Sequence, residues 1–368
     1  MQVIKFIKKH TVFCIAALAA IITSVIIPPD SQYITYFDWK TLACLFLTLA
    51  VICALRNIKF FTILARRLVL ITGNLRTLFL MLITITFLGS MIIANDMALI
   101  TFLPLGYFAL SVSKNEKYMA YLFILQNISA NLGGMLTPFG NPQNLYLYSY
   151  FNIPTAEFTK IMFPPFLVAI LLLLLSSLIV KPIKLTITDD FKEKLNTPKT
   201  ILYLALFAVS ILIVFRIIEF WVGLIIIPIV LFIVDKDSLK MVDYPLLGTF
   251  FLFFIFAGNL SRMEVVNSFV SSLLEKNTLL VSIISCQGIS NVPSAILLSR
   301  FTTDYKSLLL GVNIGGVGTL ISSLASLITF SEYKILYPDK TKNYFYLFTL
   351  LNFIFLIIMT LITMFFFI

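Results

Sequence analysis

The amino-acid sequence predicts an all-α polytopic membrane protein, with about nine transmembrane helices plus two opposed re-entrant hairpins in an inverted repeat. Of the 368 residues, 60% are apolar and 12% are charged, whereas a soluble domain carries about 25% charged residues. Leu, Ile and Phe recur in apolar runs of about 15–20 residues, the length at which a helix crosses about 30 Å of hydrocarbon. Continuous runs of this kind exclude a transmembrane barrel, whose strands alternate apolar and polar residues.

Short polar loops divide the apolar runs into nine expected crossings. In chain order they are residues 11–27, 40–55, 117–150, 161–180, 200–215, 218–234, 246–260, 306–331 and 344–368. The first run follows Lys5, Lys8 and Lys9 and has no small-residue cleavage site before Pro28, so we expect an uncleaved helix. With the N-terminus in the cytoplasm and the C-terminus outside, twenty of the 27 Lys and Arg residues lie on the cytoplasmic side, as the positive-inside rule requires.

Two further apolar stretches, residues 77–112 and 278–302, are expected to form hairpins that enter and leave the membrane by one face. The arms of the second hairpin have about 10 residues each around the Ser-Asn-Val-Pro turn at 290–293, and about 20 are needed to cross. The second hairpin must therefore be re-entrant, and the internal repeat extends this to the first. Residues 58–72 and 262–276 are amphipathic and too charged to span. The first suits a helix at the cytoplasmic interface, and for the second an ordinary basic loop is the alternative.

The two halves of the chain resemble each other in three places, in the same order. The matching segments are 34–55 with 239–260, 94–96 with 290–292, and 131–137 with 313–319. The last pair, NLGGMLT and NIGGVGT, agrees at Asn, at both Gly and at Thr. Three matches in order indicate an internal repeat.

The repeat divides the chain into a first unit at residues 1–180, a polar cytoplasmic linker at 181–199 and a second unit at 200–368. Under the expected topology the first hairpin opens to the cytoplasm and the second to the outside, so the two units are inverted. Inverted repeats with interrupted helices hold substrate and coupling ions near the membrane midplane. We therefore expect the site to lie where the two units meet.

Asp96 is the one acidic or basic side chain deep within the apolar runs, and it follows Asn95 at the expected tip of the first hairpin. A carboxylate at the bilayer centre costs roughly 2.5–3.5 kcal/mol on insertion scales, and such residues usually face a cavity and bind or relay a cation. We interpret Asp96 as a carboxylate that takes up H⁺ or Na⁺. The alternative is a residue at a water-filled turn, or one that stays protonated in a structural hydrogen bond.

The segment NLGGMLTPFGNPQN at residues 131–144 combines three Gly and two Pro with five polar side chains inside the apolar stretch 117–150. Gly and Pro interrupt the hydrogen bonds of a helix, and carbonyls freed in lipid cost several kcal/mol each unless a partner satisfies them. A cation would satisfy these carbonyls, and the amides at the start of the next half-helix would attract an anion. A kinked helix satisfied by neighbouring side chains is the alternative.

The counterpart NIGGVGTLISS at residues 313–323 lies within the expected crossing 306–331 and lacks the prolines, so its ion site is expected to be weaker or absent. Taken alone, its small residues would also suit close packing of helices. The second hairpin tip, Ser290 and Asn291 followed by Pro293, offers a hydroxyl and an amide to an oxyanion or a cation.

Several chemistries lack the residues that they need. His10 is the sole histidine, and the four cysteines lie in apolar stretches without a CxxC pair, so His-based metal sites, Ser-His or Cys-His catalysis and a disulfide framework are not expected. The net charge of +10 is spread over short loops, which indicates membrane orientation and not a nucleic-acid surface. We expect neither an enzyme nor a cofactor, and Na⁺ as the one metal ion.

Four segments resemble the ion transporter superfamily, which includes citrate transporters, arsenite permeases, sodium/proton antiporters and divalent anion:sodium symporters. They are ANDMALITFLPL (94–105), ANLGGMLTPFGNPQNL (130–145), SNVPSAILL (290–298) and GVNIGGVGTLISSLASLI (311–328). The resemblance implies a scaffold domain, a transport domain with two opposed hairpins, a homodimer and an elevator-type mechanism. The tips Asn-Asp-Met and Ser-Asn-Val differ from the Ser-Asn-Thr tips of sodium–dicarboxylate members and are closer to the citrate and arsenite branches.

The breaks in the helices and the positions matched in the resemblance give two sets of candidate site residues. Those expected to couple a cation are Asp96, Asn95, Asn131, Thr137, Asn291, Gly318 and Thr319. Those expected to bind the substrate are Gly140, Asn141, Pro142, Asn144, Ser290, Pro293, Asn313 and Ser322.

These observations predict a secondary active transporter in a bacterial-type inner or plasma membrane, which moves a small anion (a carboxylate or an inorganic oxyanion) with Na⁺ or H⁺. Arsenite or antimonite efflux and Na⁺/H⁺ antiport are the close alternatives. A passive anion channel is a further one, and its flux would not depend on an opposing ion gradient. The expected partners are the anion, the coupling ion, the lipid bilayer and a second copy of the chain.

Overall fold

The computed structural model describes residues 11–185 and 194–367, and in that part of the chain it contains α-helices and short 3₁₀ helices but no β-strand. Among these residues, eight helices are long and apolar enough to cross a membrane, and two shorter apolar helices, α2 (Thr11–Ile26) and α11 (Phe220–Val234), accompany them. The expected all-α multi-pass membrane protein is therefore confirmed. The orientation of the two termini stays a prediction, and part of the expected linker, residues 186–193, lies outside the described residues.

The other helices follow the expected crossings. In the first half they are α3 (Trp39–Asn57), α4 (Phe60–Leu70), α5 (Leu75–Ile93), α6 (Asn95–Val112), α7 (Met119–Gly133), α8 (Pro142–Tyr150) and α9 (Thr155–Leu178), with the 3₁₀ helices η1 (Ser31–Tyr36), η2 (Glu116–Tyr118) and η3 (Gly134–Leu136). In the second half they are α10 (Thr197–Val214), α12 (Lys236–Lys240), α13 (Tyr244–Ser261), α14 (Glu264–Ile289), α15 (Asn291–Leu298), α16 (Tyr305–Ile314), α17 (Leu324–Leu336) and α18 (Thr341–Phe366), with η4 (Pro338–Lys340). Each expected crossing falls on one helix or on an interrupted pair of helices.

The two expected hairpins are helix pairs of unequal length. Residues 77–112 form α5 and α6, and residues 278–302 form the last part of α14 together with α15. α5 and α6 have 19 and 18 residues, so each is long enough to cross a membrane, whereas α15 has 8 residues. Helix length alone does not decide whether the first hairpin is re-entrant, and this stays a prediction.

α14 is broken at Asn277, whose backbone lies outside the helical region at φ −166° and ψ 91°. The side-chain Oδ1 of Asn277 accepts a hydrogen bond from the backbone N of Leu280 at 2.9 Å. Asn277 therefore caps a new helix that begins at Thr278. The break separates the amphipathic stretch 262–276 from the hairpin, at the boundary that the sequence predicts.

Two helix caps accompany the sequence match between residues 34–55 and 239–260. At the start of α3, Asp38 Oδ1 accepts from the backbone N of Thr41 at 3.0 Å, and at the start of α13, Asp243 Oδ1 accepts from that of Leu246 at 3.0 Å. The two aligned carboxylates therefore begin the two aligned helices in the same way, which supports the predicted repeat.

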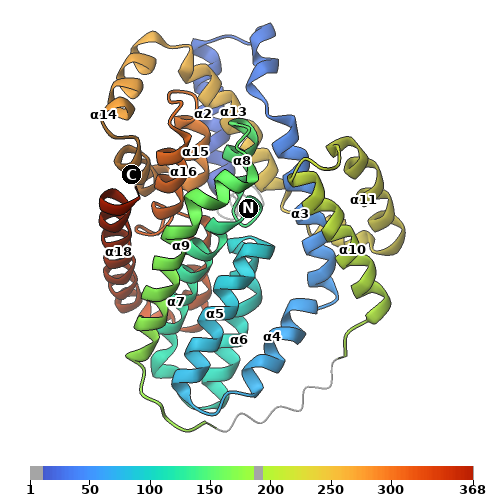
Figure 1. The fold of residues 1–368 in the computed structure, drawn as a ribbon, viewed down its shortest axis with the longest axis vertical. Coiled ribbons are helices and arrows are strands. Elements are labelled where there is room, and N and C mark those ends of the chain that lie inside the picture. The colour runs from blue at the N-terminus through green and yellow to red at the C-terminus, as the bar shows by residue number, and fades with distance from the viewer. Residues whose placement is uncertain (1–10, 186–193, 368) are drawn as a thin grey trace.

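The helices pack in two groups. Figure 1 shows α5 and α6 side by side in the lower centre of the molecule, with α8, α15 and α16 above them. α5 packs against α6, α7 and α9, and α14 packs against α15 and α16. α3 packs against α10, α11 and α12, and α13 against α2. The hairpins and interrupted helices thus form one group, and α2, α3 and α10–α13 form the other. α13 also packs against α15, and α3 against α8, so these contacts join the two groups.

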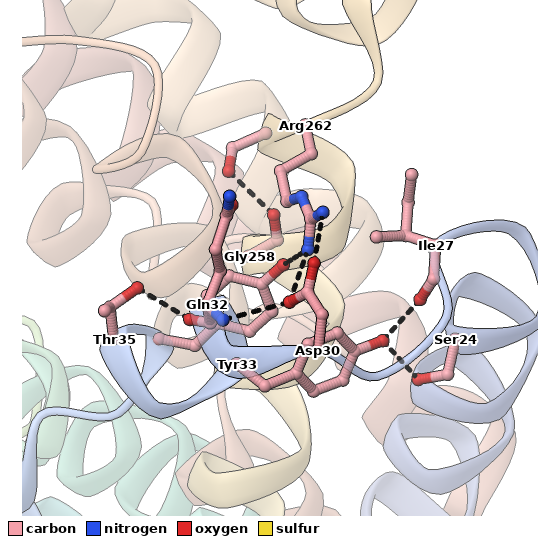
Figure 2. A network of polar contacts seen from close by, with 10 residues as sticks. Ser24, Ile27, Asp30, Gln32, Tyr33, Thr35, Gly258 and Arg262 are labelled. Carbon is pink, nitrogen blue, oxygen red and sulfur yellow. Dashed lines mark hydrogen bonds and ion pairs between the residues drawn. The ribbon is translucent and has the colours of Figure 1, made fainter.

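A polar network ties η1 to α13 (Figure 2). The Arg262 guanidinium donates to both carboxylate oxygens of Asp30, at 3.1 and 2.7 Å, and to the Tyr36 hydroxyl at 3.0 Å. Tyr36 covers Gly258, where a Cβ would approach the Tyr36 ring to 2.4 Å. Arg300, which follows α15, donates to the Tyr36 carbonyl. η1 therefore connects α13 to the second hairpin.

Candidate functional site

The two hairpin tips share one backbone conformation and one local hydrogen bond. Ala94 lies at φ 65° and ψ 154°, and Ser290 at φ 76° and ψ 159°, a region that is essentially restricted to glycine. The asparagine that follows, Asn95 or Asn291, accepts at Oδ1 from the next backbone N, at 3.0 Å in the first tip and 2.9 Å in the second. The Ala-Asn-Asp and Ser-Asn-Val segments that match in sequence therefore also match in geometry.

The first interrupted helix is α7–η3–α8, and Asn144 satisfies its free carbonyls. Asn144 Nδ2 donates to the carbonyl oxygens of Gly134 and Met135 at 3.2 Å each and to that of Thr137 at 3.3 Å. Glycine at position 140 lets the loop close, because a Cβ there would lie 2.4 Å from the Gly134 carbonyl oxygen. A side-chain amide thus meets the carbonyls that the interruption frees.

Two further residues fix this first loop. Thr137 Oγ1 donates to the Met91 carbonyl at 2.6 Å, which ties the loop to α5 just below the hairpin tip. Pro142 is the first residue of α8, a position that suits proline because the first N–H groups of a helix have no partner within the helix. Pro142 therefore restarts the helix after the break.

The second interrupted helix is α16–α17, and Gln287 of α14 holds its loop. Gln287 Nε2 donates to the carbonyls of Gly315 at 2.9 Å and Val317 at 3.3 Å, and its Oε1 accepts from the backbone N of Thr319 at 2.9 Å. Thr319 Oγ1 donates to the Gln287 carbonyl at 3.0 Å. Gln287 therefore acts on the second loop as Asn144 acts on the first.

The two interrupted helices meet at Asn313. Its Nδ2 donates to Asn144 Oδ1 at 2.6 Å, and its Oδ1 accepts from Asn141 Nδ2 at 3.2 Å and from Gln143 Nε2 at 3.4 Å. All four side chains are buried, with at most 1% of each residue exposed. Uncharged amides therefore make this contact between the two predicted units.

Each hairpin tip lies against an interrupted helix. Asn95 Nδ2 donates to Asn131 Oδ1 at 3.2 Å, and the backbone N of Asn291 donates to the Ser322 carbonyl at 2.9 Å. Gly316 brings the two pairs together, because a Cβ at Gly316 would lie 3.0 Å from Asn291 Nδ2 and 3.6 Å from Asn131 Oδ1. The tips and the loops of both halves therefore converge on one region of the interior.

Four helices begin in this region. α6 starts at Asn95, α8 at Pro142, α15 at Asn291 and α17 at Leu324. The N-terminus of a helix carries unpaired N–H groups and a partial positive charge of roughly half an elementary charge. Four such ends around one region favour a negatively charged ligand.

Asp96 is 7% exposed and lies in the first turn of α6, beside this region. Among the described residues, no Lys or Arg lies within ion-pair distance of its carboxylate. Arg56 contacts Met97, the residue after Asp96, with Nη1 3.9 Å from Met97 Sδ. The equivalent position in the second tip is the apolar Val292, so the carboxylate belongs to the first half alone.

The structure brings most of the predicted residues together but gives three of them a role within the second loop. Gly318 adopts φ 138°, which favours glycine, and Thr319 is bound to Gln287. Ser322 Oγ donates to the Gly316 carbonyl at 2.9 Å. Pro293 lies buried in the first turn of α15 and offers no side-chain hydrogen bond.

Three amide residues of this network were missed in the sequence. Gln287 is one, and the other two are Asn127 and Asn352, whose side chains meet where Asn127 Nδ2 donates to Asn352 Oδ1 at 3.4 Å. Asn131 Nδ2 donates to the Asn127 carbonyl at 3.1 Å, which extends the network from the hairpin tip to α18. Each of them is an amide within an apolar helix, and such residues usually form hydrogen bonds with neighbouring helices. This pattern could have identified them in the sequence.

A second buried carboxylate, Asp235, lies outside this region at the end of α11 and is 8% exposed. It accepts two hydrogen bonds from Asn57 Nδ2, at 2.9 and 3.0 Å, and one from the Tyr203 hydroxyl at 3.1 Å. Asp235 therefore has a structural role that its sequence position in a loop concealed. In the part of the chain that the structure describes, no group of three His, Cys, Asp or Glu could hold a metal ion.

A cavity of about 910 Å³ lies between α14, the α15–α16 turn and α18. Its charged lining residues are Glu275, Lys276, Arg300 and Asp304, so the two signs are balanced. None of the predicted site residues lines this cavity. It is therefore separate from the region where the loops and tips converge.

Comparison with known proteins places these features in a family. The sequence model of the citrate transporter family matches residues 2–304. The uncharacterized transporter MJ0456 of Methanocaldococcus jannaschii is 34% identical over 293 residues, which cover 79% of this chain and 80% of the relative. The inner membrane protein YbiR of Escherichia coli is 29% identical over 299 residues, 79% of each chain.

Proposed function

The chain belongs to the citrate transporter family, and from that premise we propose that it is a secondary active transporter that moves a small anion together with Na⁺ or H⁺. Family membership makes it a multi-pass membrane transport protein of the ion transporter superfamily. The proposal adds the solute class, carboxylate or inorganic oxyanion, the coupling through Asp96, and transport without a catalytic step.

One observation carries the proposal: the convergence of two hairpin tips and two interrupted helices on a buried region of uncharged amides. Asn141, Asn144 and Asn313 form its centre, and four helix N-termini surround it. Helix N-termini and amide N–H groups bind oxyanions without a buried cationic side chain. This arrangement supports a small anion as the transported solute, and citrate is one member of that class.

Asp96 is proposed as the coupling group. Its carboxylate lies next to Asn95, which contacts the first interrupted helix through Asn131. A buried carboxylate without an ion-pair partner favours uptake of H⁺ or Na⁺, and the cation then offsets the charge of the anion nearby. Coupling by mutual neutralisation would therefore explain why the acid lies on one tip only.

We propose an elevator-type movement in a homodimer. The predicted site residues lie on the hairpins and interrupted helices, which pack against one another, while α3 packs with α10, α11 and α12. Such a division suits a moving domain and a stationary one. The outer faces of α10 and α11 expose large apolar residues such as Ile201, Trp221 and Phe232, which suits contact with lipid or with a second copy.

The coupling role is tested with Asp96→Asn in liposomes. We expect the variant to lose gradient-driven accumulation of solute at least tenfold, because the neutral amide cannot take up a cation. Exchange of solute between equal concentrations should continue, since it needs no net coupling. Asp38→Asn is the matched control, because asparagine also caps helices and the substitution should leave coupled uptake unchanged.

Full accumulation by Asp96→Asn would reject Asp96 as the coupling group. Flux of wild-type protein without any dependence on an opposing Na⁺ or H⁺ gradient would identify a passive channel. The solute is identified by thermal shifts of purified protein with carboxylates, sulfate, phosphate and arsenite, each with and without Na⁺, because a ligand that binds the folded state raises its stability. A response to arsenite alone would favour the efflux alternative, and a response to Na⁺ without any anion would favour antiport.

A further inference from the structure

Gln287 makes more hydrogen bonds with the second interrupted helix than a cap requires. Its Nε2 donates to the carbonyls of Gly315 and Val317, at 2.9 and 3.3 Å, and to the Ile283 carbonyl of its own helix at 3.2 Å. Its Oε1 accepts from the Thr319 backbone N at 2.9 Å. The carboxamide thus forms hydrogen bonds with the carbonyls of Gly315 and Val317 and with the backbone N of Thr319, which have no partners within the interrupted helix.

The fit of Gln287 depends on the glycine beside it. Gly318 lies at φ 138°, and a Cβ there would be 2.1 Å from Gln287 Oε1. Any other residue would therefore both strain the backbone and displace the carboxamide. The loop is shaped around this particular side chain.

Carbonyls of an interrupted helix in a membrane protein need either a donor or a cation. In the second loop the NH₂ group of Gln287 already supplies the donor. We propose that Gln287 is the positioning residue of this loop, and that its carboxamide takes the place of a cation at the Gly315 and Val317 carbonyls, so that the loop folds without an ion. This rests on the proposed function only in treating the loop as part of a transport site.

The proposal makes the chemistry of one atom decisive. Gln287→Glu keeps the size and shape of the side chain but replaces the NH₂ donor with a second oxygen. The carboxylate would then face the two carbonyl oxygens, and oxygen ligands of this kind suit a cation such as Na⁺. The variant should therefore need an ion where the wild-type protein needs none.

The test compares the effect of Na⁺ on unfolding in purified full-length variants. Thermal unfolding is measured in 150 mM sodium chloride and in 150 mM choline chloride, and the difference between the two midpoints is the sodium increment. We expect the increment of Gln287→Glu to exceed that of the wild-type protein by roughly 3 °C, as for a ligand at about ten times its dissociation constant. Lowering the pH should remove this excess, because protonation of the introduced carboxylate gives the variant a donor again.

The matched control is Gln126→Glu. Gln126 is fully buried, whereas Gln287 is half-buried. Gln126 Nε2 donates to Thr86 Oγ1 and to the Phe102 carbonyl, both at 3.1 Å, but Gln126 closes no loop of an interrupted helix. We expect this variant to lose stability without any gain in the sodium increment. An equal gain in both variants would overturn the proposal, since any buried carboxylate would then produce it.

A sodium increment of Gln287→Glu no larger than that of the wild-type protein would also overturn the proposal. If Gln287→Glu does not fold, Gln287→Ala replaces it, because removal of the carboxamide also frees the Gly315 and Val317 carbonyls for a cation. A larger increment in Gln287→Ala than in the wild-type protein supports the proposal, and an equal one contradicts it. The experiment measures unfolding and not flux. Its result would therefore still decide the role of Gln287 if the proposed transport activity were not found.

Discussion

At the hairpin tips, single residues hold a backbone conformation that glycine alone adopts without strain. Ala94 and Ser290 both lie at positive φ with ψ near 155°, which costs a residue with a Cβ about 1–3 kcal/mol. Such strain persists only where the surrounding structure imposes it, and it clusters at binding sites. The tips therefore hold their asparagines in place at the expense of stability.

Ala94→Gly should relieve this strain. We expect the free energy of unfolding to rise by about 1 kcal/mol, because the gain at positive φ outweighs the added freedom of glycine in the unfolded chain. Ala98→Gly is the matched control, since Ala98 is buried within α6 and glycine in a helix costs about 1 kcal/mol. Chemical denaturation of both variants checks the signs, and a loss of stability in Ala94→Gly would show that the tip is not strained.

Residue by residue, the sequence predicts those site positions that carry a visible signal. Asn131, Asn141 and Asn313 stand out because Gly and Pro surround them or because the repeat aligns them, and the structure brings them together. Gln287 has no such neighbours, and only the folded chain shows that it reaches the second loop. The conformation of Ala94 is equally hidden, since alanine usually indicates a regular helix.

At the scale of elements, α14 shows how one capping residue divides a helix. From charge alone, the sequence predicts that residues 262–276 stay outside the membrane and that residues 278–302 form a hairpin within it. In the structure, α14 (Glu264–Ile289) covers the first stretch and the first arm of the second, and it consists of two helical parts joined at Asn277, where the backbone leaves the helical region. Charge pattern thus located the boundary, although it could not show that the two parts stay joined.

Asn277→Ala should remove the cap of the second part of α14. We expect a loss of about 1 kcal/mol in the free energy of unfolding, because the backbone N of Leu280 loses its bond to Oδ1. Hydrogen exchange should become faster in residues 278–289 before it does elsewhere. Asn277→Asp keeps an acceptor oxygen and should retain most of the stability. Equal exchange rates in the alanine variant and the wild-type protein would contradict a capping role.

The lengths of the elements mark the limit of prediction from the repeat. Symmetry between the halves favours equal hairpins, but α5 and α6 are each more than twice as long as α15. The repeat records which residues match, whereas the length of an arm depends on how many apolar residues each half has kept. Re-entry of the first hairpin therefore needs a direct test of accessibility from each side of the membrane.

At the scale of the whole molecule, the ion pair between Asp30, which caps η1, and Arg262, at the end of α13, joins these two elements (Figure 2). The Arg262 guanidinium holds the pKa of Asp30 below its ordinary value of 3.8. A carboxyl group whose pKa is lowered on folding stabilises the protein above its ordinary pKa, and this contribution disappears as the pH falls through the lowered value.

Asp30→Asn should therefore be less stable than the wild-type protein near neutral pH, and the gap should close as the pH falls below about 4. Thermal unfolding from pH 6 to pH 3 measures the gap. In an Arg262→Gln background the same substitution should have little effect at any pH, because the partner of the carboxylate is gone. A gap that stays constant with pH would contradict the role of the charge.

The overall class of the molecule followed from composition, because a chain that is 60% apolar can be stable only in lipid. The packing of α3 against α10 and α11 did not follow, because helices that are apolar all round give no sign of which side meets protein. Contacts such as that of Arg300 with Tyr36 are hidden as well, because the two residues lie far apart in the sequence.

The contact of Asn313 with Asn141 and Asn144 consists of dipoles without formal charge. Dissolved salt screens charges over a Debye length of about 8 Å at physiological ionic strength, but it has little effect on short hydrogen bonds between buried neutral groups. The strength of this contact between the two halves should therefore be the same at low and at high salt concentration. Salt should weaken only ion pairs at the surface, such as that of Arg262 with Asp30.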